Sequence, residues 1–190
     1  MNRNLLSGLV IGVFAGFLGG YFVGASHSND DAPAIAAAAP APPAGTGAPR
    51  PNPMEIQERI TGTKQILEAD PKNDKAWVSL GNDYFDLQQA QNSVDAYAKA
   101  LILAPDNPDV LTDQGVMYRA LKDYPRAIAD FKRAGKVDPR HQQSLFNLGV
   151  VYAEDLKQND EALKVWNKIL AIDPASPQAA QARAAIASLK

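Results

Sequence analysis

The chain beyond residue 53 carries apolar residues at the spacing of short amphipathic helices, arranged in pairs. Intervals of three and four residues place the apolar side chains on one side of a helix and leave the other side polar. The first pair has two such faces, made by Trp77, Leu80, Tyr84 and Leu87, then by Tyr97, Ala100 and Leu101. The pattern predicts two helices joined by a short turn.

The pair recurs with a fixed period, which indicates an internal repeat. Three sets of residues keep a period of 34, with one extra residue in the last proline interval: Gly81, Gly115 and Gly149; Tyr84, Tyr118 and Tyr152; Pro71, Pro105, Pro139 and Pro174. A small and a large residue of the second helix match each glycine, as expected where two helices touch closely. These are Ser93 and Tyr97, Ala127 and Phe131, and Ala162 and Trp166.

The segment from Trp77 to Tyr84, followed by Ser93, Tyr97, Ala100 and Pro105, resembles the tetratricopeptide repeat, or TPR. The resemblance implies an all-α fold, a right-handed α-solenoid of helix-turn-helix units. The three full units are expected at residues 74-107, 108-141 and 142-176. The extra residue of the third unit is expected to lengthen its inter-helix turn, near Lys157 to Asp160.

Single helices are expected at both ends of this domain, which spans residues 54-190. A leading helix at residues 54-70 resembles only the second half of a repeat. A capping helix is predicted at residues 177-189, because Ser176 is a favourable N-cap and Pro177 suits the first turn. Its apolar stripe is expected to cover the end of the array; the stripe consists of Ala182, Ile186 and Leu189.

The N-terminal segment is predicted to cross a membrane once. The stretch from Leu5 to Val23 has no charged residue, and as a helix it spans roughly 28 Å, close to the thickness of a bilayer's hydrocarbon core. Arg3 before it favours a cytoplasmic N-terminus and export of the rest of the chain. Residues 1-25 are therefore expected to form an anchor. The alternative is a cleaved signal peptide, since small residues precede Ser26.

Glycine recurs at every fourth position within this segment, at Gly8, Gly12, Gly16, Gly20 and Gly24. Such a strip lets a second helix approach closely and predicts pairing inside the membrane, hence a homo-oligomer. The alternative is that glycine is simply frequent in spanning helices. Residues 26-53 are rich in Ala and Pro, with too little apolar bulk to fold, and are predicted to form a disordered linker.

Composition excludes several classes of function. The formal net charge is -2, from 19 basic and 21 acidic residues, so no nucleic acid partner is expected. There are no cysteines, and His27 and His141 have no ligand-spaced neighbours, so no metal or cofactor is predicted and both histidines are expected to be solvated. Acidic pairs such as Glu154 and Asp155 are interpreted as solvated charge near turns. With no catalytic motif, the chain is not expected to be an enzyme.

The resemblance also implies a binding site. In TPR proteins the first helices line a concave groove that binds a peptide or a partner helix. The positions carried over are Lys75, Val78, Asn82 and Phe85, then Thr112, Val116 and Arg119, then Phe146, Asn147 and Val150. The apolar members favour one face of an amphipathic helix, with Arg119 available for an acidic group. The alternative is that some of these side chains pack against the neighbouring repeat.

The leading hypothesis is a scaffold in the inner membrane that mediates protein-protein interactions, with its N-terminus cytoplasmic and its TPR domain periplasmic. The layout resembles membrane-anchored bacterial TPR proteins such as accessory subunits of cytochrome c biogenesis, in which such a domain holds unfolded apocytochrome. It implies a role in assembly or maturation of envelope proteins. The alternatives are a self-associating structural component without a dedicated client, and a cryptic hydrolase.

Overall fold

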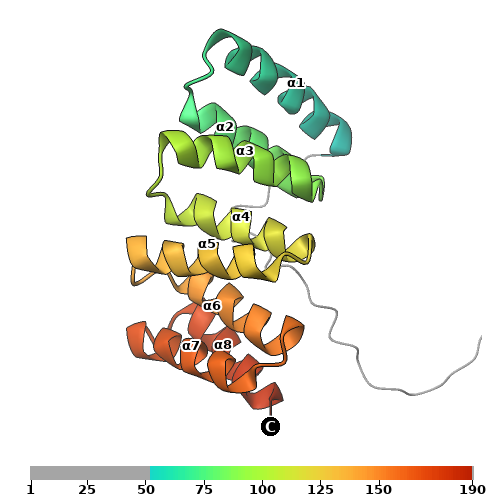
Figure 1. Cartoon of the computed structure of the whole chain (residues 1–190). Coiled ribbons are helices and arrows are strands. Elements are labelled where there is room, and N and C mark those ends of the chain that lie inside the picture. The colour runs from blue at the N-terminus through green and yellow to red at the C-terminus, as the bar shows by residue number, and fades with distance from the viewer. Residues whose placement is uncertain (1–51, 190) are drawn as a thin grey trace, which may run out of the picture. The chain divides into compact units, whose positions relative to one another are not determined.

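The computed structural model describes residues 52–189, and their regular structure is entirely helical. The all-α prediction is confirmed. Eight α-helices and one π-helical turn form a stack of antiparallel pairs (Figure 1). In chain order they are α1 (Pro53–Ala69), α2 (Asp74–Asp86), α3 (Ala90–Leu103), α4 (Pro108–Ala120), α5 (Tyr124–Val137), α6 (Gln142–Val150), η1 (Val151–Asp155), α7 (Asn159–Ile172) and α8 (Pro177–Ser188).

Asparagine and serine caps begin several of these helices. Asn73 and Asn107, at equivalent positions of successive repeats, accept hydrogen bonds from the first turns of α2 and α4. Asn52 and Glu55 form a capping box at the start of α1, which satisfies N–H groups that have no partner within the helix. Pro53 is consequently the first residue of α1, whereas the sequence assigned it to the linker.

The two helices of each unit touch at a glycine. An added Cβ at Gly115 would lie 2.7 Å from Cε1 of Phe131, so only glycine allows this approach. An added Cβ would lie closer still to Tyr97 at Gly81 and to Trp166 at Gly149. The hydroxyl of Ser93 adds a buried hydrogen bond of 2.9 Å to the carbonyl of Gly81. The repeating pair of a glycine and an aromatic ring therefore holds each hairpin together.

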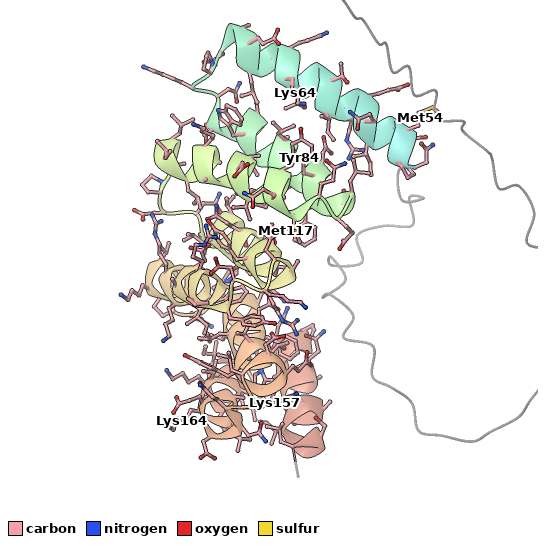
Figure 2. All side chains as sticks on the ribbon, turned by 45° about the vertical axis from the view of Figure 1, so that its right-hand side comes forward. Met54, Lys64, Tyr84, Met117, Lys157 and Lys164 are labelled. Carbon is pink, nitrogen blue, oxygen red and sulfur yellow. The ribbon has the colours of Figure 1, made fainter. Side chains whose placement is uncertain are left out.

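The core is a series of apolar clusters between successive helices. Its most deeply buried large side chains include Tyr97, Phe131, Ile60, Leu111 and Ile169. At the N-terminal end, Lys64 of α1 lies over the ring of Tyr84 of α2, 5.8 Å from its centroid (Figure 2). At the C-terminal end, Ala182 is fully buried and Ile186 and Leu189 pack against the same cluster, so α8 covers the last repeat as its stripe predicts.

The first helices of the repeats form one continuous row. α2 contacts α4, α4 contacts α6, and α6 contacts α8, whereas within residues 52–189 no comparable contact joins the second helices α3, α5 and α7. The stack is therefore tighter on the side of α2, α4 and α6. We call the solvent-facing side of these three helices the inner face.

The predicted lengthening of the third turn is wrong. In all three units the turn contains one residue with a left-handed backbone, Gln88, Lys122 or Lys157, with φ of 57°, 60° and 57°. The turn is thus the same each time. The extra residue instead widens the end of the first helix into η1, where the N–H of Leu156 bonds to the carbonyl of Val151, five residues back.

The predicted anchor at residues 1-25, its glycine strip, His27 and nearly all of the predicted linker lie outside the described residues. Within residues 52–189, no helix has the length and apolar character needed to cross a membrane.

Candidate functional site

In the first repeat, the predicted groove residues lie on the inner face. Lys75 and Asn82 are exposed, and the amide oxygen of Asn82 accepts a 2.7 Å hydrogen bond from the hydroxyl of Tyr97. Val78 and Phe85 are half-buried because one side of each packs against the cluster around Tyr97. This stretch offers both apolar surface and a fixed polar group to a partner.

In the second repeat, only part of the prediction reaches the surface. Val116 is half-buried and packs beside Phe131. Thr112 is only 2% exposed, and its hydroxyl donates a 2.7 Å hydrogen bond to the carbonyl of Pro108. Thr112 therefore stabilises α4 from within and is not available as a surface contact.

Arg119 is not available for a partner's acidic group, contrary to the expectation from the sequence. Its guanidinium lies 2.5 Å from Asp155 and 2.7 Å from Glu154, both on η1. Burial works against its charge, but the hydrogen bonds to Asp155 and Glu154 outweigh this effect and raise the pKa of Arg119. Glu154 and Asp155 are therefore not simply solvated, since they join α4 to the third repeat.

In the third repeat, Phe146 and Val150 are half-buried at the inner face. The ring of Phe146 stacks on Trp166 with centroids 6.2 Å apart. Asn147 is only 5% exposed; its oxygen accepts from Gln143, while its Nδ2 has no partner in the described part of the chain. Asn147 therefore lies beneath the surface that its neighbours form.

The sequence interpretation missed two positions of the same row, one exposed and one half-buried. Asp109 and Gln143 occupy the place of Lys75 in the second and third repeats, one period apart. The side chain of Asp109 is 82% exposed. The period of 34 residues was the signal that identifies both. The three equivalent positions thus present a cation, an anion and an amide along the inner face.

A mostly buried carboxyl lies between the first two repeats. Burial, and secondarily the nearby charge of Asp109, raise the pKa of Asp113 to about 7. Burial and the charges of Asp113, Asp86 and Asp83 together raise the pKa of Tyr97 far above its ordinary value. Arg59 of α1 pairs with Asp83 and lies 4.0 Å from Asp86. Carboxyl groups therefore gather at the start of the inner face, where Arg59 offsets part of their charge.

His141 is not solvated as expected, and its role is structural. Its side chain is 14% exposed, with Nε2 2.9 Å from Oδ1 of Asp109. Its Nδ1 accepts from the N–H of Ser144 and so caps α6. Across residues 52–189 there is no cluster of three or more histidines and carboxylates that could hold a metal ion.

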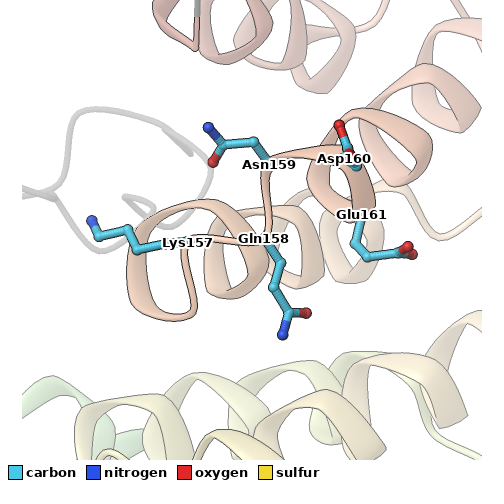
Figure 3. A pocket seen from close by; sticks show the side chains of 5 residues that line it. All are labelled: Lys157, Gln158, Asn159, Asp160 and Glu161. Atoms are coloured by element: carbon cyan, nitrogen blue, oxygen red, sulfur yellow. The ribbon is translucent and has the colours of Figure 1, made fainter.

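A shallow hollow of about 380 Å³ lies where the turn after η1 meets the start of α7. Five consecutive polar residues line it. Figure 3 shows that the side chains of residues 157–161 point in different directions and do not converge on a common point. A binding or catalytic site needs a few convergent polar groups in a concave pocket. The inner face is therefore the better candidate for function.

Comparison with known proteins agrees with this architecture. The model of the family "Cytochrome c-type biogenesis protein H TPR domain" matches residues 44–180. The chain belongs to this family. The matched segment of this chain contains all three helices that form the inner face, α2, α4 and α6.

Curated relatives match roughly half of this chain. The human protein O-mannosyl-transferase TMTC3 is 29% identical over 104 residues, which are 53% of this chain and 11% of that protein. The co-chaperone sgt12 of Aspergillus fumigatus is 31% identical over 80 residues, 42% of this chain and 23% of that protein. The chain thus spans a small part of the length of these relatives.

Solved structures show the same fold. A crystal structure of MamA has a TM-score of 0.61 at 22% identity, covering 64% of this chain and 70% of that chain. A tetratricopeptide repeat protein from Parabacteroides merdae has a TM-score of 0.63 at 21% identity, covering 70% and 53% of the two chains. These likenesses show that this chain has the TPR fold.

Proposed function

We propose that this chain is a membrane-anchored TPR scaffold that holds a protein or peptide partner on its inner face, on the periplasmic side of the inner membrane. The observation that carries the proposal is the row of half-buried apolar side chains on α2, α4 and α6. Part of each side chain is exposed to solvent, while its packing against the core fixes its position. These side chains are Val78 and Phe85 on α2, Val116 on α4, and Phe146 and Val150 on α6. Preorganised apolar surface lowers the entropic cost of binding.

The chemistry of the inner face suggests what the partner is like. Apolar side chains alternate with fixed polar groups such as Asn82 and Gln143, a combination that suits an amphipathic helix. With Arg119 already paired, the exposed charges of the inner face include the ammonium group of Lys75 in the first repeat and the carboxylate of Asp109 in the second. The proposed partner segment therefore has an apolar stripe, with an acidic group opposite Lys75 and a basic group opposite Asp109.

The family suggests the pathway. Its name refers to cytochrome c-type biogenesis, so the proposed client is an unfolded or partly folded c-type cytochrome on its way to maturation. The scaffold itself would perform no chemistry. The proposed spanning helix at residues 5-23 and the linker at residues 26-53 would let the domain follow a client near the membrane surface.

Site-specific photo-crosslinking in cells tests the inner face. A photoreactive residue replaces Asn82 or Gln143, which reach the inner face, or Gln91 or Lys168, which are on α3 and α7 away from it. We expect adducts with one envelope protein from the inner positions alone. Equal adducts from all four positions, or none from the inner pair, would contradict the proposed site.

Membrane topology needs a separate measurement. A protease added to the outside of spheroplasts is expected to digest the TPR domain, and detergent should be needed to release the intact chain from membranes. A domain protected until the membrane is broken would overturn the proposed periplasmic location, whatever the crosslinking shows. Release by salt alone would overturn the proposed anchor.

A further inference from the structure

The two ends of the stack carry complementary halves of a repeat. α1 precedes α2 as α3 precedes α4, so it occupies the place of a second helix. α8 follows α7 as α4 follows α3, so it occupies the place of a first helix. They lie at opposite ends of the stack (Figure 1). Within residues 52–189, α1 therefore lacks its first helix and α8 lacks its second.

The open face of α1 corresponds, by repeat position, to the face of α3 that packs against α2. Counting back 34 residues, Thr63 of α1 corresponds to Tyr97 and Ile66 corresponds to Ala100. Ala100 is 2% exposed, but Ile66 is 51% exposed. An added Cβ at Gly62, on the same side of α1, would meet nothing within 4 Å. Apart from Thr63, which is half-buried, this face of α1 has no cover in the described part of the chain.

Arg59 does not block that face. It stands where α3 has Ser93, but its guanidinium is drawn onto α2, where Nε lies 3.0 Å from Oδ1 of Asp83. The buried carboxylate of Asp83 holds the arginine head group against α2. The remaining surface of the open face consists of Gly62, Thr63 and Ile66.

The open face of α8 is lined by small side chains. Counting forward 35 residues from the third repeat, Ala184 corresponds to Gly149 and Ala187 corresponds to Tyr152. The whole face is exposed and consists of Ala180, Arg183, Ala184 and Ala187. On the opposite side of the helix, Ala179 and Ala182 are fully buried against the last repeat.

The two open faces match in size. In each internal hairpin a glycine of the first helix meets an aromatic ring of the second, and a Cβ there would collide with the ring. At the ends both partners change together: α8 has Ala184 in place of the glycine, and α1 has Thr63 in place of the ring. The added methyl group of one would find the space that the missing ring of the other leaves.

They also match in charge. Leu80 and Ala96 pack together inside the first repeat, and the corresponding residues at the ends are Arg183 and Gly62. The empty space over Gly62 has room for the arginine side chain. Glu58 lies one turn earlier on α1 and is exposed, so it can accept a hydrogen bond from the guanidinium.

We propose that α8 of one copy docks on α1 of the next, so that two copies of this chain complete a TPR hairpin between them. The contact is heterologous, because it joins two different faces of the chain. Every pair therefore has one free α1 and one free α8. The row of first helices continues from one copy to the next. The inner face then continues across the junction, and a partner longer than one domain has a binding surface of matching length.

The absence of cysteine from the chain allows a direct test. Full-length protein in detergent is prepared as two single-cysteine variants, Thr63→Cys and Ala184→Cys, and treated with a short bis-maleimide. We expect a cross-linked dimer when the two variants are mixed and none when either is alone. The matched control is Lys168→Cys, exposed on α7, which should not cross-link with Thr63→Cys. Any association between copies through another part of the chain would be the same in all of these variants.

Each contrary result overturns the proposal in a distinct way. Cross-linking of Thr63→Cys with itself would indicate a symmetric contact between two α1 helices. No cross-link in the mixture would mean that α8 is only a terminal cap, or that another segment of the same chain covers α1. An equal cross-link with Lys168→Cys would mean nonspecific collision.

Blocking variants provide a second measurement by sedimentation of the full chain. Thr63→Glu and Ala184→Glu each remove one of the two faces, so neither should associate alone through this contact. Mixed together, they retain one intact face of each kind and should form one-to-one pairs and nothing larger. Pairs that fail to form in the mixture, although each variant is folded by circular dichroism, would overturn the head-to-tail contact.

Discussion

The N–H of Leu156 donates a 3.0 Å hydrogen bond to the carbonyl of Val151, five residues earlier. The equivalent leucines, Leu87 and Leu121, bond to carbonyls four residues earlier. The extra residue of the third repeat therefore lies between Tyr152 and Leu156, where it widens the helix by one residue. It also brings Asp155 to Arg119, which joins the third repeat to the second.

The pair of Arg119 and Asp155 is expected to stabilise the fold. Their side chains are only 22% and 17% exposed, and the loss of a partner from a partly buried charge is costly. Asp155→Ala should lower the free energy of unfolding by about 1–3 kcal/mol, and the double variant with Arg119→Met should lose less than the sum of the two single variants. Urea denaturation of all four proteins measures this coupling.

The exposed pair of Lys164 and Glu161 is the matched control for that cycle. Both side chains are about half exposed or more, at 66% and 48%, so solvent screens the pair and its coupling should be clearly weaker than that of Arg119 and Asp155. Equal coupling in the two cycles would mean that burial at η1 contributes nothing.

Close packing at the third hairpin leads to a second prediction. Gly149→Ala places a methyl group against the indole of Trp166 and disturbs the 3.2 Å bond from its Nε1 to the carbonyl of Phe146. Such overpacking should cost about 1–3 kcal/mol in thermal or urea unfolding. Gly135→Ala is the control, because a Cβ there meets nothing within 4 Å, and it should stabilise α5 by up to about 1 kcal/mol. A neutral Gly149→Ala would refute the tight contact.

The repeat made most of the fold predictable. A glycine, a tyrosine and a proline at the same places in each unit are consequences of packing between adjacent helices, so their recurrence locates both helices of every hairpin. The position of the extra residue was also encoded, since Leu87, Leu121 and Leu156 show where the period changes from 34 to 35 residues. Comparing aromatic residues alone put the change on the wrong side of Leu156.

The surface of the inner face was less predictable because it depends on contacts between repeats. Thr112 and Val78 occupy the same repeat position, yet Thr112 is buried beside His141 while Val78 stays half-buried. Arg119 meets acids 35 and 36 residues later in the chain. A helical pattern reports which side of its own helix a residue is on, but not what the next repeat places over it.

Stability should depend on pH through Asp113. The pKa of this carboxyl is raised by burial to about 7 from 3.8, so the folded chain holds its proton more tightly than the unfolded chain does. The stabilisation from protonation is present below about pH 4 and is lost as the pH rises to about 7. Asp113→Asn should remove this loss and raise the free energy of unfolding above pH 7, by at most about 4 kcal/mol.

The control for Asp113 is Asp109→Asn, on the same helix but with an 82% exposed side chain. It should leave most of the pH dependence between about pH 4 and 7 in place, because the burial of Asp113 remains the main cause of its raised pKa. Urea unfolding at several pH values separates the two variants. If Asp113→Asn shows the same pH dependence as the unmodified chain, the shift belongs to another group.

The capping role of His141 predicts a graded series of substitutions. His141 stands where the first two repeats have Asn73 and Asn107, and like them it accepts hydrogen bonds from the first turn of its helix. His141→Ala should destabilise the fold by about 0.5–2 kcal/mol, the usual cost of a lost N-cap. His141→Asn should restore most of that stability, because asparagine supplies the same acceptor, although it gives up the 2.9 Å contact with Asp109. Thermal unfolding of the three proteins distinguishes the roles: if alanine and asparagine are equally destabilising, the contact with Asp109 and not the cap is what His141 contributes.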